Sequence, residues 1–279
     1  MFAQPETEEQ LCRTIALCKE CGVKYYLLGN GSNILFEDAG YRGVVIDTTA
    51  LKMGIGILEN VCHPGAAPGE VYDAVAAGAG LKLSALCTAA LENGLTGLEF
   101  AYGIPGTVGG AVYMNAGAYG GEMKDVLASV DVLTQDLEIK TIPAAELNLG
   151  YRYSSIPEKG YIVLGATLQL KKGNIAEIRG RMAELAEQRR AKQPLQYPSA
   201  GSTFKRPEGY FAGKLVQDAG LKGKTIGGAQ VSEKHSGFLI NIGGATAQDI
   251  LDLIAFCQKE VKDKFGVTLE TEVKIVGEE

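Results

Sequence analysis

The chain has 279 residues, of which 46% are hydrophobic and 22% are charged, an ordinary composition for a globular protein of two or three modest domains. Its formal net charge of −6 argues against nucleic acid or an anionic membrane as the main partner, because both attract basic surfaces. No uninterrupted apolar run is long enough to span a bilayer, and the acidic start from Met1 to Glu9 has no apolar core, so we expect a cytoplasmic protein without a membrane segment.

The first predicted helix runs from Thr7 to Cys21. Thr7 followed by Gln10 is typical of a capping box, and Gly22 ends the helical pattern. The pair Cys18-x-x-Cys21 lies at the end of this helix, whereas redox-active pairs lie at a helix start and zinc ribbons need a second pair. We therefore expect the cysteines to be reduced and largely buried, and we expect no metal site.

Short strands follow, each bounded by glycine or turn residues, and a tight turn through Gly29–Asn33 joins the first two. Their predicted ranges are 25–28, 34–36, 43–47 and 53–58. His63 lies alone in the next loop and is given no role. Val71–Ala77 is predicted to be a hairpin partner, and a helix from Ser84 to Glu92 comes next.

Strands resume after the glycine-rich middle of the chain, and the last of them alternates apolar residues on one face. Their predicted ranges are 126–134, 138–143 and 161–170. From Asn174 the period changes to that of an amphipathic helix, which ends in the basic run Arg189-Arg190-Ala191-Lys192 before Pro194. We interpret this change as the start of a new domain.

A final helix is predicted from Thr246, whose partner in a capping box is Asp249, to Phe265, where Gly266 stops it. Val267–Val276 is predicted to be a closing strand. Together the elements predict an α+β protein with domains at residues 1–50, 51–172 and 173–279.

Two glycine-rich segments are the most informative part of the sequence. The first, Gly29–Asn33, places polar side chains between two strands. In the second, the charge-free run Ile104–Ala118, glycines leave the backbone without Cβ atoms, so amide groups can approach a diphosphate or a ring edge. Neither segment is a Rossmann fingerprint or a phosphate-binding loop with Gly-Lys-Ser/Thr. We interpret the second segment as a buried loop that cradles a cofactor.

Further motifs extend this pattern along the chain. In order, the segments are Leu28–Leu35, Gly97–Gly120, Tyr151–Ser154, Gly201–Pro207, Gly227–Ala229 and Glu272–Gly277. These segments resemble the UDP-N-acetylenolpyruvoylglucosamine reductases, which are bacterial flavoenzymes of peptidoglycan synthesis. The resemblance covers nearly the whole chain.

The resemblance implies both a fold and a reaction. The expected fold is an FAD-binding fold of the PCMH or VAO type with two subdomains, followed by a C-terminal α+β substrate-binding domain whose last strand returns to the active site. The expected reaction is the NADPH-dependent, FAD-mediated reduction of the enolpyruvyl group of UDP-N-acetylglucosamine enolpyruvate to UDP-N-acetylmuramate. We expect a monomeric oxidoreductase that serves peptidoglycan precursor synthesis, and through it cell wall biogenesis, cell shape and cell division.

By resemblance, both glycine-rich segments hold FAD through their backbone amides. The expected cofactor-binding residues are Gly29, Asn30, Gly31, Ser32, Asn33, Gly103, Ile104, Pro105, Gly106, Thr107, Val108, Gly109, Gly110, Asn115, Gly117 and Ala118.

Reduction of an enolpyruvyl double bond needs a hydride source, a group that stabilises charge on the carboxylate, and a proton donor. Arg152 lies between two tyrosines, where its fork of donors could grip a carboxylate. Ser202 lacks the Gly-x-Ser-x-Gly elbow of a hydrolase, so a proton donor fits it better than a nucleophile. By resemblance Arg152, Ser202 and Glu272 are catalytic, although the pattern alone does not separate Glu272 from Glu270.

Cations of the third domain suit the diphosphate of a nucleotide substrate within an acidic protein. The expected substrate-binding residues are Tyr153, Lys192, Lys205, Arg206 and His235. Lys205 is also expected to help stabilise the transient alkoxide of Ser202. Arg206 stands where many relatives carry asparagine.

Two departures from the family pattern bear on the site. Almost nothing is inserted between Tyr153 and the strand that begins at Tyr161, so the chain resembles the shorter subclass without a tyrosine-bearing loop, which implies a more open site. The chain also begins close to its first helix, where relatives carry a segment that supplies the first strand of the FAD domain. Two alternatives stay open: another FAD-dependent oxidoreductase of the same fold, and an inactive relative that binds UDP-sugars.

Overall fold

The computed structural model describes residues 1–51, 54–61 and 71–277. The chain divides into two compact units, one of Met1–Asn30 with Gly43–Glu187 and one of Gly31–Arg42 with Gln188–Glu279. A domain boundary was predicted near residue 173, whereas in the structure the chain passes from the first unit to the second after Glu187. The prediction for His63 and the predicted strand start at Met53 lie outside the described residues.

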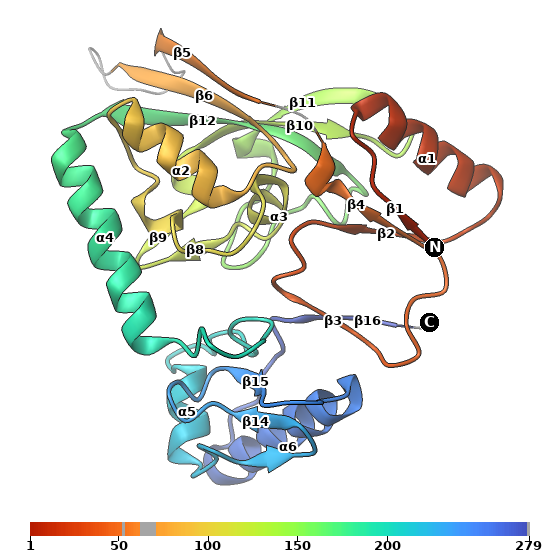
Figure 1. Ribbon diagram of the computed structural model, residues 1–279, viewed down its shortest axis with the longest axis vertical. Coiled ribbons are helices and arrows are strands. Elements are labelled where there is room, and N and C mark those ends of the chain that lie inside the picture. The colour runs from red at the N-terminus through yellow and green to blue at the C-terminus, as the bar shows by residue number, and fades with distance from the viewer. Residues whose placement is uncertain (52–53, 62–70, 278–279) are drawn as a thin grey trace. The chain divides into compact units, whose positions relative to one another are not determined.

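A small parallel sheet and one helix begin the first unit (Figure 1). Its elements are β1 (Phe2–Ala3), α1 (Glu8–Glu20), β2 (Tyr25–Leu28) and β4 (Val44–Asp47), with the strand order β1-β4-β2. The Thr7 hydroxyl accepts a hydrogen bond from the Gln10 amide, as predicted, but the Gln10 side chain accepts from the Glu6 amide rather than from Thr7. β1 supplies a first strand in a place where the sequence predicted none.

The larger sheet of the first unit is antiparallel and carries its core. Its strands are β5 (Ile55–Val61), β6 (Tyr72–Gly78), β7 (Leu95–Thr96), β10 (Leu127–Leu133), β11 (Ile139–Pro143) and β12 (Ile162–Lys172). In the described residues the order is β11-β10-β12-β6-β5, with β7 beside β12. Buried residues of β6, β10 and β12 pack with α2 (Leu83–Glu92), α3 (Val108–Tyr113) and α4 (Ile175–Lys192) (Figure 1). The predicted hairpin and helix at 71–92 are confirmed.

The second unit is built around α6 (Ala247–Phe265), which begins and ends at the predicted residues. Thr246 and Asp249 form the predicted capping box, and Gly266 takes a left-handed conformation (φ 71°) that ends the helix. Asp38 also caps this helix, because its carboxylate accepts hydrogen bonds from the amides of Ala247 (2.7 Å) and Gln248 (3.0 Å). This contact fastens residues 31–42 to the second unit.

The other elements of the second unit are short. They are β3 (Ile34–Phe36), α5 (Ala212–Asp218), β13 (Thr225–Ile226), β14 (Ala229–Val231), β15 (Leu239–Asn241) and β16 (Lys274–Val276). β13, β14 and β15 form an antiparallel sheet, and β16 pairs in parallel with β3. The predicted closing strand from Val267 is therefore wrong in length, because only its last three residues have regular strand pairing.

Two further predictions differ from the structure. The turn at Gly29–Asn33 does not join a pair of neighbouring strands, because β2 pairs with β4 and β3 pairs with β16. The glycine-rich segment was predicted to be a loop, yet it contains α3 and a small hairpin of β8 (Gly117–Ala118) and β9 (Gly121–Glu122). Because glycine has a low helix propensity, a six-residue segment with two glycines is not predicted to be a helix from its sequence.

The described cysteines are free thiols, and Cys18, Cys87 and Cys257 are buried while Cys21 is exposed. Burial raises the pKa of the Cys87 and Cys257 thiols to about 12, which makes them unreactive. Within the described residues, no group of side chains has the composition of a metal site. None of the helices described is both long and apolar enough to cross a membrane.

Asp73 of β6 is buried at 1% exposure, and its carboxylate meets Lys172 of β12 at 2.8 Å and the Asn60 amide at 3.1 Å. Burial alone raises the pKa of Asp73, but the hydrogen bonds from Lys172 and Asn60 and the charge of Lys172 outweigh it and hold the pKa below its usual value. The ion pair therefore stabilises the folded state above the carboxyl's usual pKa and loses this effect as pH falls through the lowered value.

We expect Asp73→Asn to lower the free energy of unfolding by about 1–3 kcal/mol at pH 7, because the ammonium of Lys172 and the backbone amide of Asn60 lose a charged, buried partner. Urea unfolding of both proteins at pH 7 and at pH 3 measures the effect, and the difference should shrink in acid. Glu59→Gln is the matched control, since Glu59 meets the same lysine but is 67% exposed. An equal loss in both variants, or one independent of pH, would contradict this account.

Candidate functional site

The two glycine-rich segments predicted to hold a cofactor meet within the first unit. The Asn30 amide group donates a hydrogen bond to the Pro105 carbonyl at 2.8 Å. A Cβ atom on Gly29 would lie 2.8 Å from the Thr107 hydroxyl, so only glycine allows this close approach. The first of these segments is divided between the units after Asn30, so Gly31, Ser32 and Asn33 belong to the second unit.

α3 forms because Thr107 caps it and its apolar residues are buried. The Thr107 hydroxyl accepts a hydrogen bond from the Gly110 amide at 3.3 Å, and Thr107 itself is only 1% exposed. The amides of Val108 and Gly109 donate to the carbonyls of Leu81 and Ala79 at 2.8 and 2.9 Å. These amides are thus used inside the protein, which differs from the prediction that they point at a diphosphate.

Gly109 has a packing reason to be glycine. A Cβ atom there would lie 2.8 Å from the Ala79 Cβ atom and 3.2 Å from the Ala79 carbonyl oxygen. Gly110, in contrast, is exposed, and its Cβ atom would meet the nearest atom at 3.4 Å. The two neighbouring glycines therefore serve different purposes: Gly109 packs against the residue that follows β6, and Gly110 faces solvent.

The surface of these segments fits a large, partly apolar cofactor. Gly103, Ile104 and Gly106 are half-buried and Pro105 is exposed, so backbone and apolar atoms are accessible here. The run from Tyr102 to Tyr119 contains no charged side chain. An uncharged surface of backbone and apolar groups suits a flavin ring system and the backbone contacts of a diphosphate.

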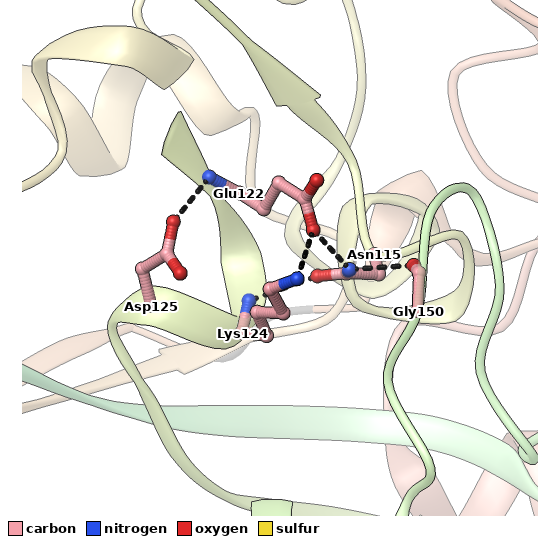
Figure 2. Close-up of polar contacts among 5 residues, drawn as sticks. All are labelled: Asn115, Glu122, Lys124, Asp125 and Gly150. Atoms are coloured by element: carbon pink, nitrogen blue, oxygen red, sulfur yellow. Dashed lines mark hydrogen bonds and ion pairs between the residues drawn. The ribbon is translucent and has the colours of Figure 1, made fainter. Parts of the chain in front are cut away.

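Asn115 does not offer its side chain to this surface, because it is fully buried. Its amide binds Glu122, Lys124 and Gly150 (Figure 2). Gly117 also has an internal reason to be glycine, since a Cβ atom there would lie 2.6 Å from the Gly121 carbonyl oxygen. The sequence prediction did not include Glu122, and its only sequence signal is an acidic residue directly after a double glycine.

Arg152 lies at the tip of a turn in the first unit and has a left-handed backbone conformation (φ 53°). Its guanidinium donates a hydrogen bond to the Gly117 carbonyl at 2.8 Å and lies 5.2 Å from the centre of the Tyr151 ring. Tyr153, predicted to bind substrate, is exposed, and its hydroxyl donates to Glu158 at 2.7 Å. This hydrogen bond raises the pKa of Tyr153.

Ser202 and Glu272 lie on neighbouring segments of the second unit. Ser202 pairs with Phe238, and the Glu272 amide donates to the carbonyl of Thr203, the residue after Ser202, at 2.8 Å. The Asn33 side chain donates to the Glu272 carbonyl at 3.0 Å, which brings the end of the first glycine-rich segment to the same place. Both Ser202 and Glu272 are half-buried.

Glu270 and Glu272 differ in surroundings, although the sequence pattern does not separate them. Glu270 is 71% exposed and pairs with Lys205 at 3.1 Å. Glu272 is half-buried beside the segment that carries Ser202. Glu272 is therefore the more enclosed of the two carboxylates, while Lys205 pairs with the carboxylate of Glu270.

The remaining predicted substrate contacts belong to the second unit. Lys192 is exposed at the end of α4, and the Arg206 guanidinium lies 3.9 Å from the centre of the Phe211 ring. His235 was grouped with the cations, but burial lowers its pKa and the charge of Lys192 lowers it further, so it is neutral at pH 7. Its Nδ1 atom accepts from the Gly237 amide at 3.1 Å, which leaves Nε2 as the donor.

A hollow of about 290 Å³ lies over the larger sheet of the first unit, lined by small residues such as Gly56, Ala76 and Gly165 and by Asp131. Asp131 accepts a hydrogen bond from the Thr141 hydroxyl at 2.6 Å. None of the predicted site residues lines this hollow, so we assign it no role in the site.

Comparisons with known proteins cover both units. A family model described as an FAD binding domain matches residues 1–142, and one described as the C-terminal domain of UDP-N-acetylenolpyruvoylglucosamine reductase matches residues 193–276. A UDP-N-acetylenolpyruvoylglucosamine reductase of Clostridium perfringens (strain SM101 / Type A) is 54% identical over 277 residues, which cover 99% of this chain and 86% of the relative.

A second relative of that name, from Caldanaerobacter subterraneus subsp. tengcongensis, is 50% identical over 278 residues. That alignment covers 100% of this chain and 87% of the relative. Among solved structures, the UDP-N-acetylenolpyruvylglucosamine reductase of Thermus caldophilus superposes with a TM-score of 0.78 at 36% identity. That alignment covers 99% of this chain and 91% of the solved one.

Proposed function

The chain belongs to the UDP-N-acetylenolpyruvoylglucosamine reductase family, and we propose that it reduces the enolpyruvyl group of UDP-N-acetylglucosamine enolpyruvate with Arg152, Ser202 and Glu272 as its catalytic residues. It is an FAD-dependent oxidoreductase with NADPH as reductant. When bound, FAD supplies the hydride for the double bond. The residues of the chain bind and orient the substrate and handle the charge and the proton.

Hydride addition to one carbon of the enolpyruvyl double bond moves negative charge to the adjacent carbon and its carboxylate. Arg152 suits the stabilisation of this charge, because its planar fork of donors matches a carboxylate. Its half-buried position makes such a contact stronger than it would be in bulk water. Glu272 shares a proton with the developing enol.

Ser202 completes the reaction by donating its hydroxyl proton to the carbon adjacent to the one that received the hydride. The hydride and this proton together saturate the double bond. The observation that carries the assignment is the hydrogen bond from the Glu272 amide to the Thr203 carbonyl at 2.8 Å, because it holds the predicted acid and the predicted carboxylate on adjoining segments. The serine alkoxide then regains its proton from solvent.

The finer assignments follow from this role. Tyr153, Lys192, Lys205 and Arg206 bind the substrate, and His235 contributes its Nε2–H group as a neutral donor. The glycine-rich segments hold FAD. We place the reaction in the cytoplasm, in the synthesis of peptidoglycan precursors, and we expect the protein to act as a monomer.

An anaerobic visible spectrum of the purified protein loaded with FAD tests the proposal. NADPH should bleach the flavin bands, and the enolpyruvyl nucleotide should then restore them. Flavin that is reduced by NADPH but reoxidised rapidly only by oxygen would point to another oxidoreductase of this fold. Binding of the nucleotide without flavin, measured by calorimetry, would point to an inactive relative and overturn the proposal.

A further inference from the structure

The turn that carries Arg152 is held by a side chain outside the predicted catalytic set. The turn is closed at its base by two backbone hydrogen bonds, from the Gly150 amide to the Tyr153 carbonyl (3.0 Å) and from the Tyr153 amide to the Gly150 carbonyl (3.2 Å). Arg152 sits at its tip in a left-handed conformation (φ 53°), which is uncommon for non-glycine residues and costs free energy that its surroundings must offset. The base of the turn is therefore where its orientation is set.

Asn115 reaches this base from the end of α3. Its Nδ2 group donates to the Gly150 carbonyl at 2.7 Å and to Glu122 Oε2 at 2.8 Å, and its Oδ1 atom accepts from the Lys124 amide at 2.8 Å (Figure 2). Two acceptors beside the nitrogen and a donor beside the oxygen fix the orientation of the amide. Since Asn115 is fully buried, these are internal contacts, and the side chain does not touch a ligand at the surface.

Glu122 accepts a hydrogen bond from Asn115, and its negative charge also interacts with the positive charge of Arg152. Its carboxylate accepts from Asn115 and pairs with Lys124 at 3.0 Å (Figure 2). Burial opposes ionisation of the Glu122 carboxyl, but hydrogen bonds from Lys124 and Asn115, together with the charges of Lys124 and Arg152, hold its pKa below its usual value. The carboxylate is therefore charged at neutral pH.

The backbone of Glu122 completes the connection to the guanidinium. Glu122 pairs with Gly117 in the β8–β9 hairpin, and the Gly117 carbonyl accepts the hydrogen bond from Arg152 at 2.8 Å. The turn is thus fixed at its base through Asn115 and at its tip through the hairpin, and both attachments involve Glu122.

We propose that Asn115, supported by Glu122, is a positioning residue for Arg152 in the reduction of the enolpyruvyl group. The proposal rests on the proposed function, in which Arg152 stabilises the charge on the substrate carboxylate. Loss of the Asn115 amide removes the hydrogen bond that ties the base of the turn to the end of α3, although the Tyr153 amide still bonds to the Gly150 carbonyl, and so lets the arginine move. A displacement of about 1 Å at a reacting group can cost on the order of 10²-fold in rate.

The test measures the two half-reactions of FAD-loaded protein by anaerobic stopped flow, after the flavin content of each variant has been determined. Asn115→Ala should slow reoxidation by the enolpyruvyl nucleotide by about 10- to 100-fold and leave reduction by NADPH nearly unchanged. Glu122→Ala should act in the same direction, and Glu122→Gln should lose less, since it keeps an oxygen that accepts from Asn115. Asn93→Ala is the matched control, because Asn93 is exposed at the end of α2 and its side-chain amide donates to the Ala89 carbonyl of that helix at 2.9 Å.

A double-mutant cycle separates positioning from a general structural effect. Asn115→Ala should have no further effect on reoxidation in an Arg152→Ala background, because the residue to be positioned is gone. An equal slowing in both backgrounds would overturn the proposal. If Arg152→Ala alone leaves reoxidation unchanged, the role of Arg152 in the proposed function fails instead. Should Asn115→Ala not fold, the Glu122 variants carry the same cycle.

Discussion

Ser202→Ala is expected to leave the reduction of FAD by NADPH within about twofold of the unaltered protein and to slow reoxidation by the enolpyruvyl nucleotide by about 10²- to 10⁴-fold, the usual worth of a positioned proton donor. The reason is that the reduction of FAD by NADPH needs no proton from Ser202. Reoxidation by the enolpyruvyl nucleotide, in contrast, leaves negative charge on a substrate carbon until a proton is donated to it. Anaerobic stopped-flow absorbance of the flavin resolves the two steps.

Ser199→Ala is a suitable control, because Ser199 precedes the same segment and is exposed. It should leave both half-reactions unchanged. If Ser202→Ala reoxidises its flavin at the rate of the control, Ser202 is not the proton donor. If instead both half-reactions slow together, the substitution has disturbed the flavin site rather than removed an acid.

The parts of the fold that local chemistry determines were predictable from the sequence. α6 is the clearest example, because a capping box at Thr246 and Asp249 and a glycine at 266 fix both of its ends. The longer strands of the larger sheet were also found to within a few residues, since turn residues bound each of them, whereas the two-residue β7 was not predicted.

Elements that depend on distant partners were not predictable. β1 has two residues and exists because it pairs with β4, more than 40 residues away along the chain. α3 contains two glycines and forms because Thr107 caps it and Ala79 and Leu81 bind its first amides. The strand at 34–36 was predicted, but its partner was not: β3 belongs to the second unit and pairs with β16 near the other end of the chain, which no local pattern indicates.

In the candidate site, too, some features could be predicted from the sequence and others depend on the fold. The residue types and order of Arg152, Ser202 and Glu272 could be read through the family resemblance, but the pairing that places Glu272 beside Thr203 comes from the fold. Asn115 was predicted to bind the cofactor because it lies in the glycine-rich motif, whereas its burial gives it an internal role. A motif records which residues recur together, and it does not separate ligand contacts from the groups that support them.

Gly109→Ala is expected to lower the free energy of unfolding by about 1–3 kcal/mol, because the added methyl group would lie 2.8 Å from the Ala79 Cβ atom and would push α3 away from the chain that follows β6. The same movement would lengthen the hydrogen bond from the Gly109 amide to the Ala79 carbonyl, now 2.9 Å. Thermal and urea unfolding of the flavin-free protein measures this loss without any contribution from bound FAD.

Gly110→Ala in the same helix is the matched comparison. The nearest side-chain atom that its methyl group would meet among the described residues is the Thr107 hydroxyl oxygen, at 3.4 Å. Alanine favours a helix over glycine by up to about 1 kcal/mol, so the flavin-free protein should be as stable or more stable. Equal destabilisation by both substitutions would contradict the packing role of Gly109. Because Gly110 is exposed, a loss of FAD affinity in Gly110→Ala with unchanged stability would assign this position to the cofactor surface and Gly109 to the packing beneath it.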